Sequence, residues 1–84
     1  MFYVYILKSQ INGSYYIGSA HDINARLEMH NHGLVKSTKR YIPWKLAHSE
    51  KYKTLNEARR RELQIKLWKK RNAIERLIDK NMGD

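Results

Sequence analysis

The sequence predicts an α+β fold: a small three-stranded antiparallel sheet flanked by helices, in the order strand-strand-helix-strand-helix-helix. Three observations support this class. Residues 2–8 are mostly aromatic or β-branched, which is typical of a buried strand. Asn12-Gly13 follows and is a strong short hairpin signal, because both residues tolerate positive φ. Asp22 and Thr54 are typical helix-capping residues, and each directly precedes a run with helical spacing.

The first half of the chain is predicted from these signals in order. The strand that returns from the hairpin covers residues 14–19. A helix then begins at Ile23, after the Asp22 cap, and stops at Gly33, a typical C-terminal residue. Residues 34–42 are basic and polar without a clear period, so they are predicted to form a loop.

The second half of the chain is predicted to contain one strand followed by helix. Residues 44–52 are predicted to form the third strand, with Leu46 and Trp44 as the inward-pointing candidates. The capping box Thr54–Glu57 starts a helix that runs to about residue 70.

The C-terminal part leaves two alternatives open. Either Asn72 caps a second, short helix, or one helix continues through it. Residues 82–84 are expected to be frayed. The sequence has no linker, repeat or low-complexity segment, so we expect one domain over residues 1–84.

Composition narrows the class of partner and the compartment. The 84 residues include 17 Lys and Arg against 8 Asp and Glu, a formal net charge of +9. This favours a polyanion, with nucleic acid first, although an acidic membrane or an acidic protein would suit the charge equally well. The absence of cysteine excludes disulfides and thiolate chemistry. No apolar run approaches the roughly 20 residues of a membrane span, so we expect a soluble cytoplasmic protein with no membrane partner.

Four of the six tyrosines fall in the predicted hairpin: Tyr3, Tyr5, Tyr15 and Tyr16. Strand alternation places Tyr3 and Tyr5 on one face, and Tyr15 and Tyr16 on opposite faces. The ordinary interpretation is aromatic packing. The alternative is that Tyr5 and Tyr16 present their hydroxyls at a shared site.

Arg26 and His30 lie four residues apart and are therefore neighbours on the surface of the first helix. An arginine beside an apolar stripe usually extends its guanidinium to water. The alternative is a helix edge that faces a phosphate, since the planar fork of arginine fits phosphate oxygens and histidine exchanges a proton near neutral pH.

Glu62 is the most informative single residue of the second helix. It lies four residues after Ala58 and three before Ile65, inside an apolar stripe. A carboxylate there costs free energy unless it is paired or binds a metal. Lys66, one turn later, offers an ion pair, and that pair and a metal site remain open alternatives.

Other polar residues are interpreted as surface. The remaining histidines, His21, His32 and His48, show no metal-ligand spacing and are expected to be ordinary surface residues. The stretches 57–61 and 69–71 are expected to form a solvated basic face that could also follow a phosphate backbone.

Taken together, these residues resemble the GIY-YIG nuclease family. Tyr3-Val4-Tyr5 corresponds to the first family tripeptide and Tyr16-Ile17-Gly18 to the second, with the expected hairpin between them. Arg26 follows Tyr16 by ten residues, His30 lies one turn further, and Glu62 matches the single metal-binding glutamate. The match spans nearly the whole chain and looks most like the small single-domain branch.

The resemblance implies a metal-dependent endonuclease that hydrolyses phosphodiester bonds, with DNA favoured over RNA and a role in DNA repair, recombination or processing. It implies one Mg²⁺ or Mn²⁺ on Glu62. Arg26 would stabilise charge on the phosphorane, Tyr5 would activate or orient water, and Tyr16 would contact the scissile phosphate. His30 would assist proton transfer or contact the phosphate. We expect nucleic-acid contacts from Gly18, Ser19, Lys36, Lys39, Arg40 and Lys66.

Three departures from the family pattern stand out. Tyr3 replaces the first glycine, Ser19 stands where some members carry a lysine, and neither Asn72 nor Asn81 fits the spacing of a late asparagine. No second domain is expected to read bases, so specificity would come from shape, weak contacts or a protein partner. The alternative function is a non-catalytic nucleic-acid-binding or adaptor module on the same fold.

Overall fold

The computed structural model describes residues 1–82, with the side chains of residues 1–80. It confirms the predicted α+β class and element order. The elements are β1 (Phe2–Ser9), β2 (Tyr15–Ala20), α1 (Ile23–Asn31), the short 3₁₀ helix η1 (Lys39–Tyr41), β3 (Trp44–Tyr52), α2 (Leu55–Trp68) and α3 (Arg71–Met82).

The three strands form an antiparallel sheet in the order β2-β1-β3, so β1 is central. Tyr5 lies opposite Gly18 on β2, and Ile6 lies opposite His48 on β3. The register of β3 shifts between Ile6 and Leu7, which is the signature of a β-bulge. Because side chains alternate along a strand, the register of β1 determines which residues reach each face.

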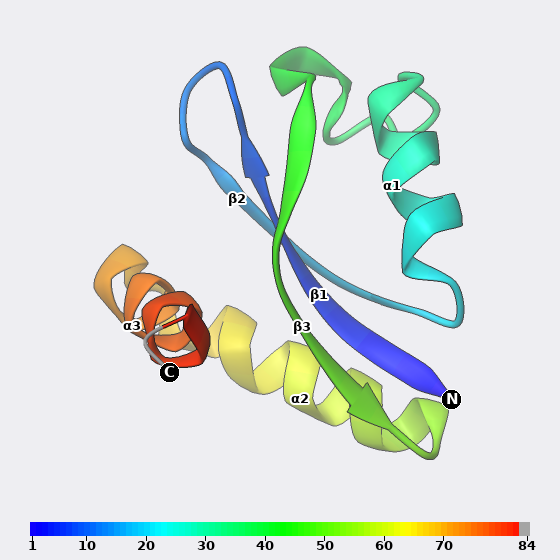
Figure 1. Ribbon diagram of the computed structural model, residues 1–84, viewed down its shortest axis with the longest axis vertical. Helices are drawn as coiled ribbons and strands as arrows, with labels where there is room; N and C mark the ends of the chain where they lie inside the picture. The colour runs from blue at the N-terminus through cyan, green and yellow to red at the C-terminus, as the bar shows by residue number, and fades with distance from the viewer. Residues whose placement is uncertain (83–84) are drawn as a thin grey trace.

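The sheet separates two small cores, because helices cover both of its faces (Figure 1). On one face, α2 and α3 pack against a buried cluster that includes Val4 and Ile6 of β1. On the other face, α1 and the segment after it pack against a cluster that includes Tyr5 and Leu7. Successive residues of β1 thus belong to different cores, and a site on the Tyr5 face is backed by packing on the other.

The predicted hairpin is confirmed, but its turn is longer than a two-residue Asn-Gly turn. β1 ends at Ser9 and β2 begins at Tyr15, and Gly13 has positive φ (75°) whereas Asn12 does not. The Ser9 hydroxyl accepts hydrogen bonds from the amides of Ile11 and Asn12, at 3.2 and 3.4 Å. The longer turn leaves these two amides outside the strand pairing, and the Ser9 hydroxyl supplies their acceptor.

The predicted boundaries of α1 are confirmed on both sides. The Asp22 carboxylate accepts a hydrogen bond from the amide of Ala25 at 3.1 Å, so Asp22 is the N-cap. After the helix, Gly33 takes φ 74°, and the amide of Leu34 donates to the carbonyl of Met29 at 3.0 Å. A left-handed residue followed by this reverse bond is a common helix ending.

The C-terminal region follows the two-helix alternative. α2 starts at the Thr54 cap, as predicted, but it ends at Trp68, because Lys69 adopts a left-handed conformation with φ 54°. α3 then begins at Arg71 rather than after an Asn72 cap. Of the end expected to fray, residues 83–84 lie outside the described part of the chain. Across residues 1–82, no helix has the length and apolar character needed to cross a bilayer.

Candidate active site

Tyr5 and Gly18 form one contact across the β1–β2 pair. Tyr5 is 1% exposed, and its ring lies against the Cα of Gly18. A Cβ atom at position 18 would lie 2.6 Å from the Tyr5 hydroxyl oxygen and 2.7 Å from Cζ, so no larger residue fits beside this ring. In this structure the group that approaches the Gly18 backbone is therefore the phenol of Tyr5.

The Tyr5 hydroxyl is 3.1 Å from Nε2 of His30, a residue of α1 that is fully buried. The other ring nitrogen, Nδ1, is 2.8 Å from the hydroxyl of Thr38. Thr38 is 1% exposed and lies in the segment that was predicted only as a basic loop. The structure thus links β1, α1 and this segment through one buried imidazole.

The Tyr16 ring packs beside the rings of Tyr5 and His30. Its ring centroid is 4.8 Å from that of His30 and 6.3 Å from that of Tyr5. Tyr15, the preceding residue, packs against the opposite core. The alternation predicted for this pair is confirmed, and Tyr16 is half-buried rather than enclosed.

Arg26 lies one turn before His30 on α1 and does not extend its whole guanidinium to water. Its Nε atom is buried and has no hydrogen-bond partner among the described residues. A buried donor without an acceptor costs roughly 1–3 kcal/mol, so the free protein carries an unsatisfied charged donor at this point.

The electrostatics of the pair Tyr5 and His30 follow from burial and from Arg26. Burial raises the pKa of Tyr5 above its usual value of 10.0, although the neighbouring Arg26 guanidinium opposes this effect. Burial, with the charge of Arg26, lowers the pKa of His30 below 6.5. At neutral pH both groups are therefore uncharged, with Tyr5 holding its proton and His30 able to accept one.

Glu62 reaches this neighbourhood from α2. It lies between the buried residues Ala58 and Ile65, as the sequence predicted, and its side chain is 19% exposed. Its charge is close enough to Tyr5 to raise the pKa of that hydroxyl.

The Glu62 carboxylate has a protein partner in the structure. The ammonium of Lys66 lies 2.5 Å from it, and the Lys66 side chain is 47% exposed. The ion pair that the sequence left open therefore forms. No group of three or more His, Asp or Glu side chains in the described part of the chain could hold a metal.

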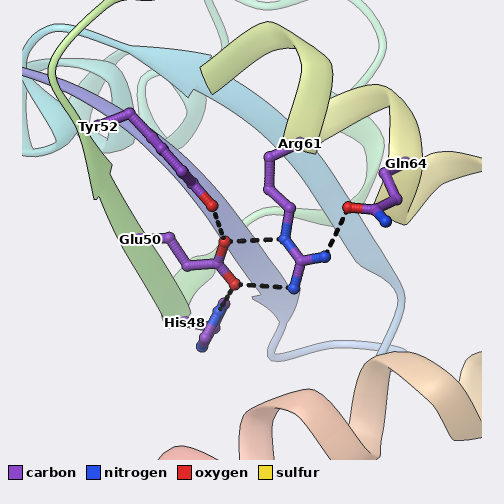
Figure 2. Close-up of polar contacts among 5 residues, drawn as sticks. All are labelled: His48, Glu50, Tyr52, Arg61 and Gln64. Carbon is purple, nitrogen blue, oxygen red and sulfur yellow. Dashed lines mark hydrogen bonds and ion pairs between the residues drawn. The ribbon is translucent and has the colours of Figure 1, made fainter. Parts of the chain in front are cut away.

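The rotation of α2 is constrained by a polar network on the β3 side (Figure 2). The Glu50 carboxylate accepts hydrogen bonds from Arg61 at 2.9 and 3.2 Å, from His48 at 2.8 Å and from Tyr52 at 2.7 Å. Burial acts to raise the pKa of Glu50, but these bonds outweigh it and hold the value at about 2.

This network corrects two predictions. His48 is not a surface residue but is 6% exposed, because β3 places it opposite Ile6 over the core. Arg61 does not belong to a wholly solvated basic face, since it pairs with Glu50 and lies 5.4 Å from the ring of Trp68. His21 and His32 are exposed, as predicted.

The other predicted contact residues are less closely grouped. Lys36, Lys39 and Arg40 are exposed on the segment that carries Thr38. Ser19 is half-buried, and strand alternation directs it to the face opposite Tyr16. Two surface hollows lie away from the Tyr5 group: one is lined by residues that include Lys8, Tyr15, Lys45, Glu75 and Asp79, and the other by residues that include Tyr3, His21 and Asn24.

The fold and this grouping define a class of protein. The chain combines tyrosines on paired strands, an arginine and a histidine on the next helix, and a glutamate on the helix that packs against the other face. The family model described as the GIY-YIG catalytic domain matches residues 1–75, and the chain belongs to this family.

Its relatives are small proteins of the same extent. UPF0213 proteins of Staphylococcus aureus strains Mu3 and N315 are each 44% identical to the chain over 77 residues, which is 90% of this chain and 92% of theirs. The solution NMR structure of the UPF0213 protein BH0048 from Bacillus halodurans is similar, with 32% identity and a TM-score of 0.58. That match covers 94% of this chain and 84% of the other.

Proposed function

We propose that the chain is a divalent-metal-dependent endonuclease that hydrolyses phosphodiester bonds of nucleic acid, with DNA as the favoured substrate and a role in DNA repair, recombination or processing. The observation that carries this proposal is the buried, unpartnered Nε of Arg26 beside the hydrogen-bonded pair of Tyr5 and His30. A phosphate oxygen would give that nitrogen the acceptor it lacks.

The geometry supports a division of roles between Tyr5 and His30. A buried tyrosine with a raised pKa is a poor base by itself, but its hydroxyl is 3.1 Å from a neutral imidazole. As Tyr5 takes a proton from the attacking water, its own proton passes to Nε2 of His30. The two residues then act as one general base, and the lowered pKa keeps His30 free to accept near neutral pH.

Arg26 and Tyr16 would act on the phosphate itself. Charge builds on the non-bridging oxygens as water attacks, and the Arg26 guanidinium would stabilise it within a partly buried environment. Tyr16 would orient the scissile phosphate, since its ring lies beside His30 and it is half-buried rather than enclosed.

A divalent cation fits the donor set on chemical grounds. A single carboxylate that is partly exposed suits Mg²⁺ or Mn²⁺, which keep most of their ligands as water and phosphate oxygens. Glu62 would hold the ion, and Lys66 would give up the carboxylate to it. When bound, the cation neutralises phosphate charge and stabilises the leaving oxygen.

The ion pair of Glu62 and Lys66 is also the observation that favours the second candidate, a non-catalytic nucleic-acid-binding or adaptor module. In that case Glu62 serves α2 as half of an i, i+4 pair, and the positive charge of the chain binds nucleic acid without cleaving it.

A cleavage assay separates the two candidates. Single-stranded, duplex, flap and branched DNA, with RNA beside them, are incubated with Mg²⁺ or Mn²⁺ and the full chain. We expect cleavage that disappears in Arg26→Ala and persists in Arg60→Ala, which removes an exposed arginine from α2. Binding without cleavage on every substrate would favour the adaptor module.

A further inference from the structure

Thr38 is buried in contact with His30, yet neither the sequence pattern nor the proposed chemistry assigns it a role. It lies in the segment between α1 and β3, and its backbone carbonyl accepts a hydrogen bond from the Trp44 indole at 2.8 Å. The side-chain amide of Asn31, the last residue of α1, accepts a hydrogen bond from the Trp44 backbone N–H at 2.6 Å and donates one to the Trp44 carbonyl at 3.0 Å. These bonds hold Thr38 in a fixed position beside the imidazole.

The hydrogen bonds around His30 have a preferred direction. A neutral imidazole carries one N–H and one acceptor nitrogen, and a hydroxyl donates one proton. The Tyr5 hydroxyl has His30 as its hydrogen-bond partner, and Arg26 beside it can only donate. If Nε2 carried the hydrogen, the buried Tyr5 proton would have no acceptor among the residues that the structure describes, which is costly.

The opposite tautomer satisfies every group. Tyr5 donates to Nε2, Nδ1–H donates to the Thr38 hydroxyl at 2.8 Å, and Thr38 donates to the carbonyl of Val35 at 3.3 Å. In this arrangement Thr38 is an acceptor toward His30 and has an acceptor for its own proton.

We infer that Thr38 is a positioning residue that fixes His30 in the Nδ1–H tautomer, so that Nε2 is available to receive the proton of Tyr5. This inference rests on the proposed function for its catalytic consequence, but the tautomer itself is a property of the free protein. Histidines that exchange protons commonly need such a partner, because the hydrogen bond of one nitrogen determines what the other can do.

The matched variants are Thr38→Val, which keeps the shape and removes the hydroxyl, Thr38→Ser, which keeps the hydroxyl, and Ser37→Ala, which removes an exposed hydroxyl one residue away. Long-range ¹⁵N–¹H correlation spectra of the metal-free protein identify which ring nitrogen of His30 carries the hydrogen. We expect Nδ1–H in the parent, in Thr38→Ser and in Ser37→Ala, and loss of that preference in Thr38→Val.

Single-turnover cleavage rates with saturating metal give the second readout. We expect Thr38→Val to be slower by about tenfold or more, and Thr38→Ser and Ser37→Ala to stay within about threefold of the parent. An Nε2–H tautomer in the parent overturns the inference, even if Thr38→Val does not fold. So does a Thr38→Val protein that keeps the Nδ1–H tautomer or the parental rate. If the tautomer responds as expected but the parent cleaves nothing, the positioning inference stands and the proposed function fails.

Discussion

Replacing Gly18 with alanine tests whether the Tyr5 hydroxyl must lie where the structure has it. The new Cβ would lie 2.6 Å from that oxygen, and reaching an ordinary contact of 3.4 Å requires a shift of about 0.8 Å. Tyr5 cannot swing into solvent, since it is 1% exposed. A shift of that size disturbs the 3.1 Å hydrogen bond to His30, because the bond depends on both its distance and its angle.

Two magnitudes follow from this displacement. Overpacking a core site typically costs about 1–3 kcal/mol, which in a domain of this size lowers the melting temperature by roughly 5–20 °C. A general base moved out of position typically costs about a hundredfold in rate. Circular dichroism melts and single-turnover cleavage at a temperature where the variant is folded measure the two effects separately.

The control for instability alone is Gly13→Ala. Gly13 has φ 75°, so alanine is strained there, but the position lies in the hairpin loop away from Tyr5. A Tyr5→Phe background gives a further check: the ring remains and the hydroxyl is gone, so adding Gly18→Ala should cost little more in rate. A folded Gly18→Ala protein that cleaves at the parental rate would refute the assignment of Tyr5.

Three further predictions concern other parts of the chain. Glu62→Gln should abolish metal-dependent cleavage while moving the melting temperature by only a few degrees, since a partly exposed i, i+4 pair is worth about 0.3–0.5 kcal/mol. Glu50→Gln should remove up to about 3 kcal/mol of stability that the parent has above pH 4.5 and loses toward pH 2, as urea titrations across that range would measure. Binding to duplex DNA should weaken at least tenfold between 50 and 200 mM salt, equally for unrelated base sequences, in fluorescence anisotropy.

Each of these has an outcome that contradicts it. For Glu62, a large loss of stability with unchanged metal dependence would assign the residue to the ion pair with Lys66. For Glu50, whose pKa is depressed, stability must fall as pH falls, so a difference between parent and variant that stays constant from pH 5 to 2 would contradict the linkage. The control for Glu50→Gln is Glu28→Gln, which changes an exposed glutamate. For binding, a flat response to salt would be incompatible with phosphate contacts as its main source.

The sequence predicted the fold because its signals are local. The strand of residues 2–8, the two helix caps and Gly33 each depend on a few neighbouring residues, and the structure confirms them. The length of the hairpin turn was missed because it depends on contacts of the Ser9 side chain, not on Asn12-Gly13 alone. The end of α2 was missed because Lys69 takes a left-handed conformation that lysine rarely signals.

Long-range polar partners could not be predicted from the sequence. Thr38 is eight residues from His30 in a segment without periodicity, and only the fold of that segment brings the two together. Arg61 and Glu50 are on different elements, and Arg61 stands in a basic run that is usually solvated. The grouping of Tyr5, Tyr16 and His30 was expected from the family resemblance, and the structure brings these three rings together.

The two faces of the sheet contribute differently to the site. Tyr5, Tyr16 and His30 are fixed by contact with one another, so their geometry depends on the core beneath α1. Glu62 is partly exposed on a separate helix, and its carboxylate accepts a hydrogen bond from the exposed Lys66. Its direction depends instead on how α2 is rotated against the sheet. Consecutive helical residues point about 100° apart, so the bonds of Arg61 to Glu50 on β3 turn the neighbouring Glu62 away from β3. Under the proposed function, in which Glu62 would release Lys66 to a cation, this arrangement keeps the helix in place while the ion pair opens.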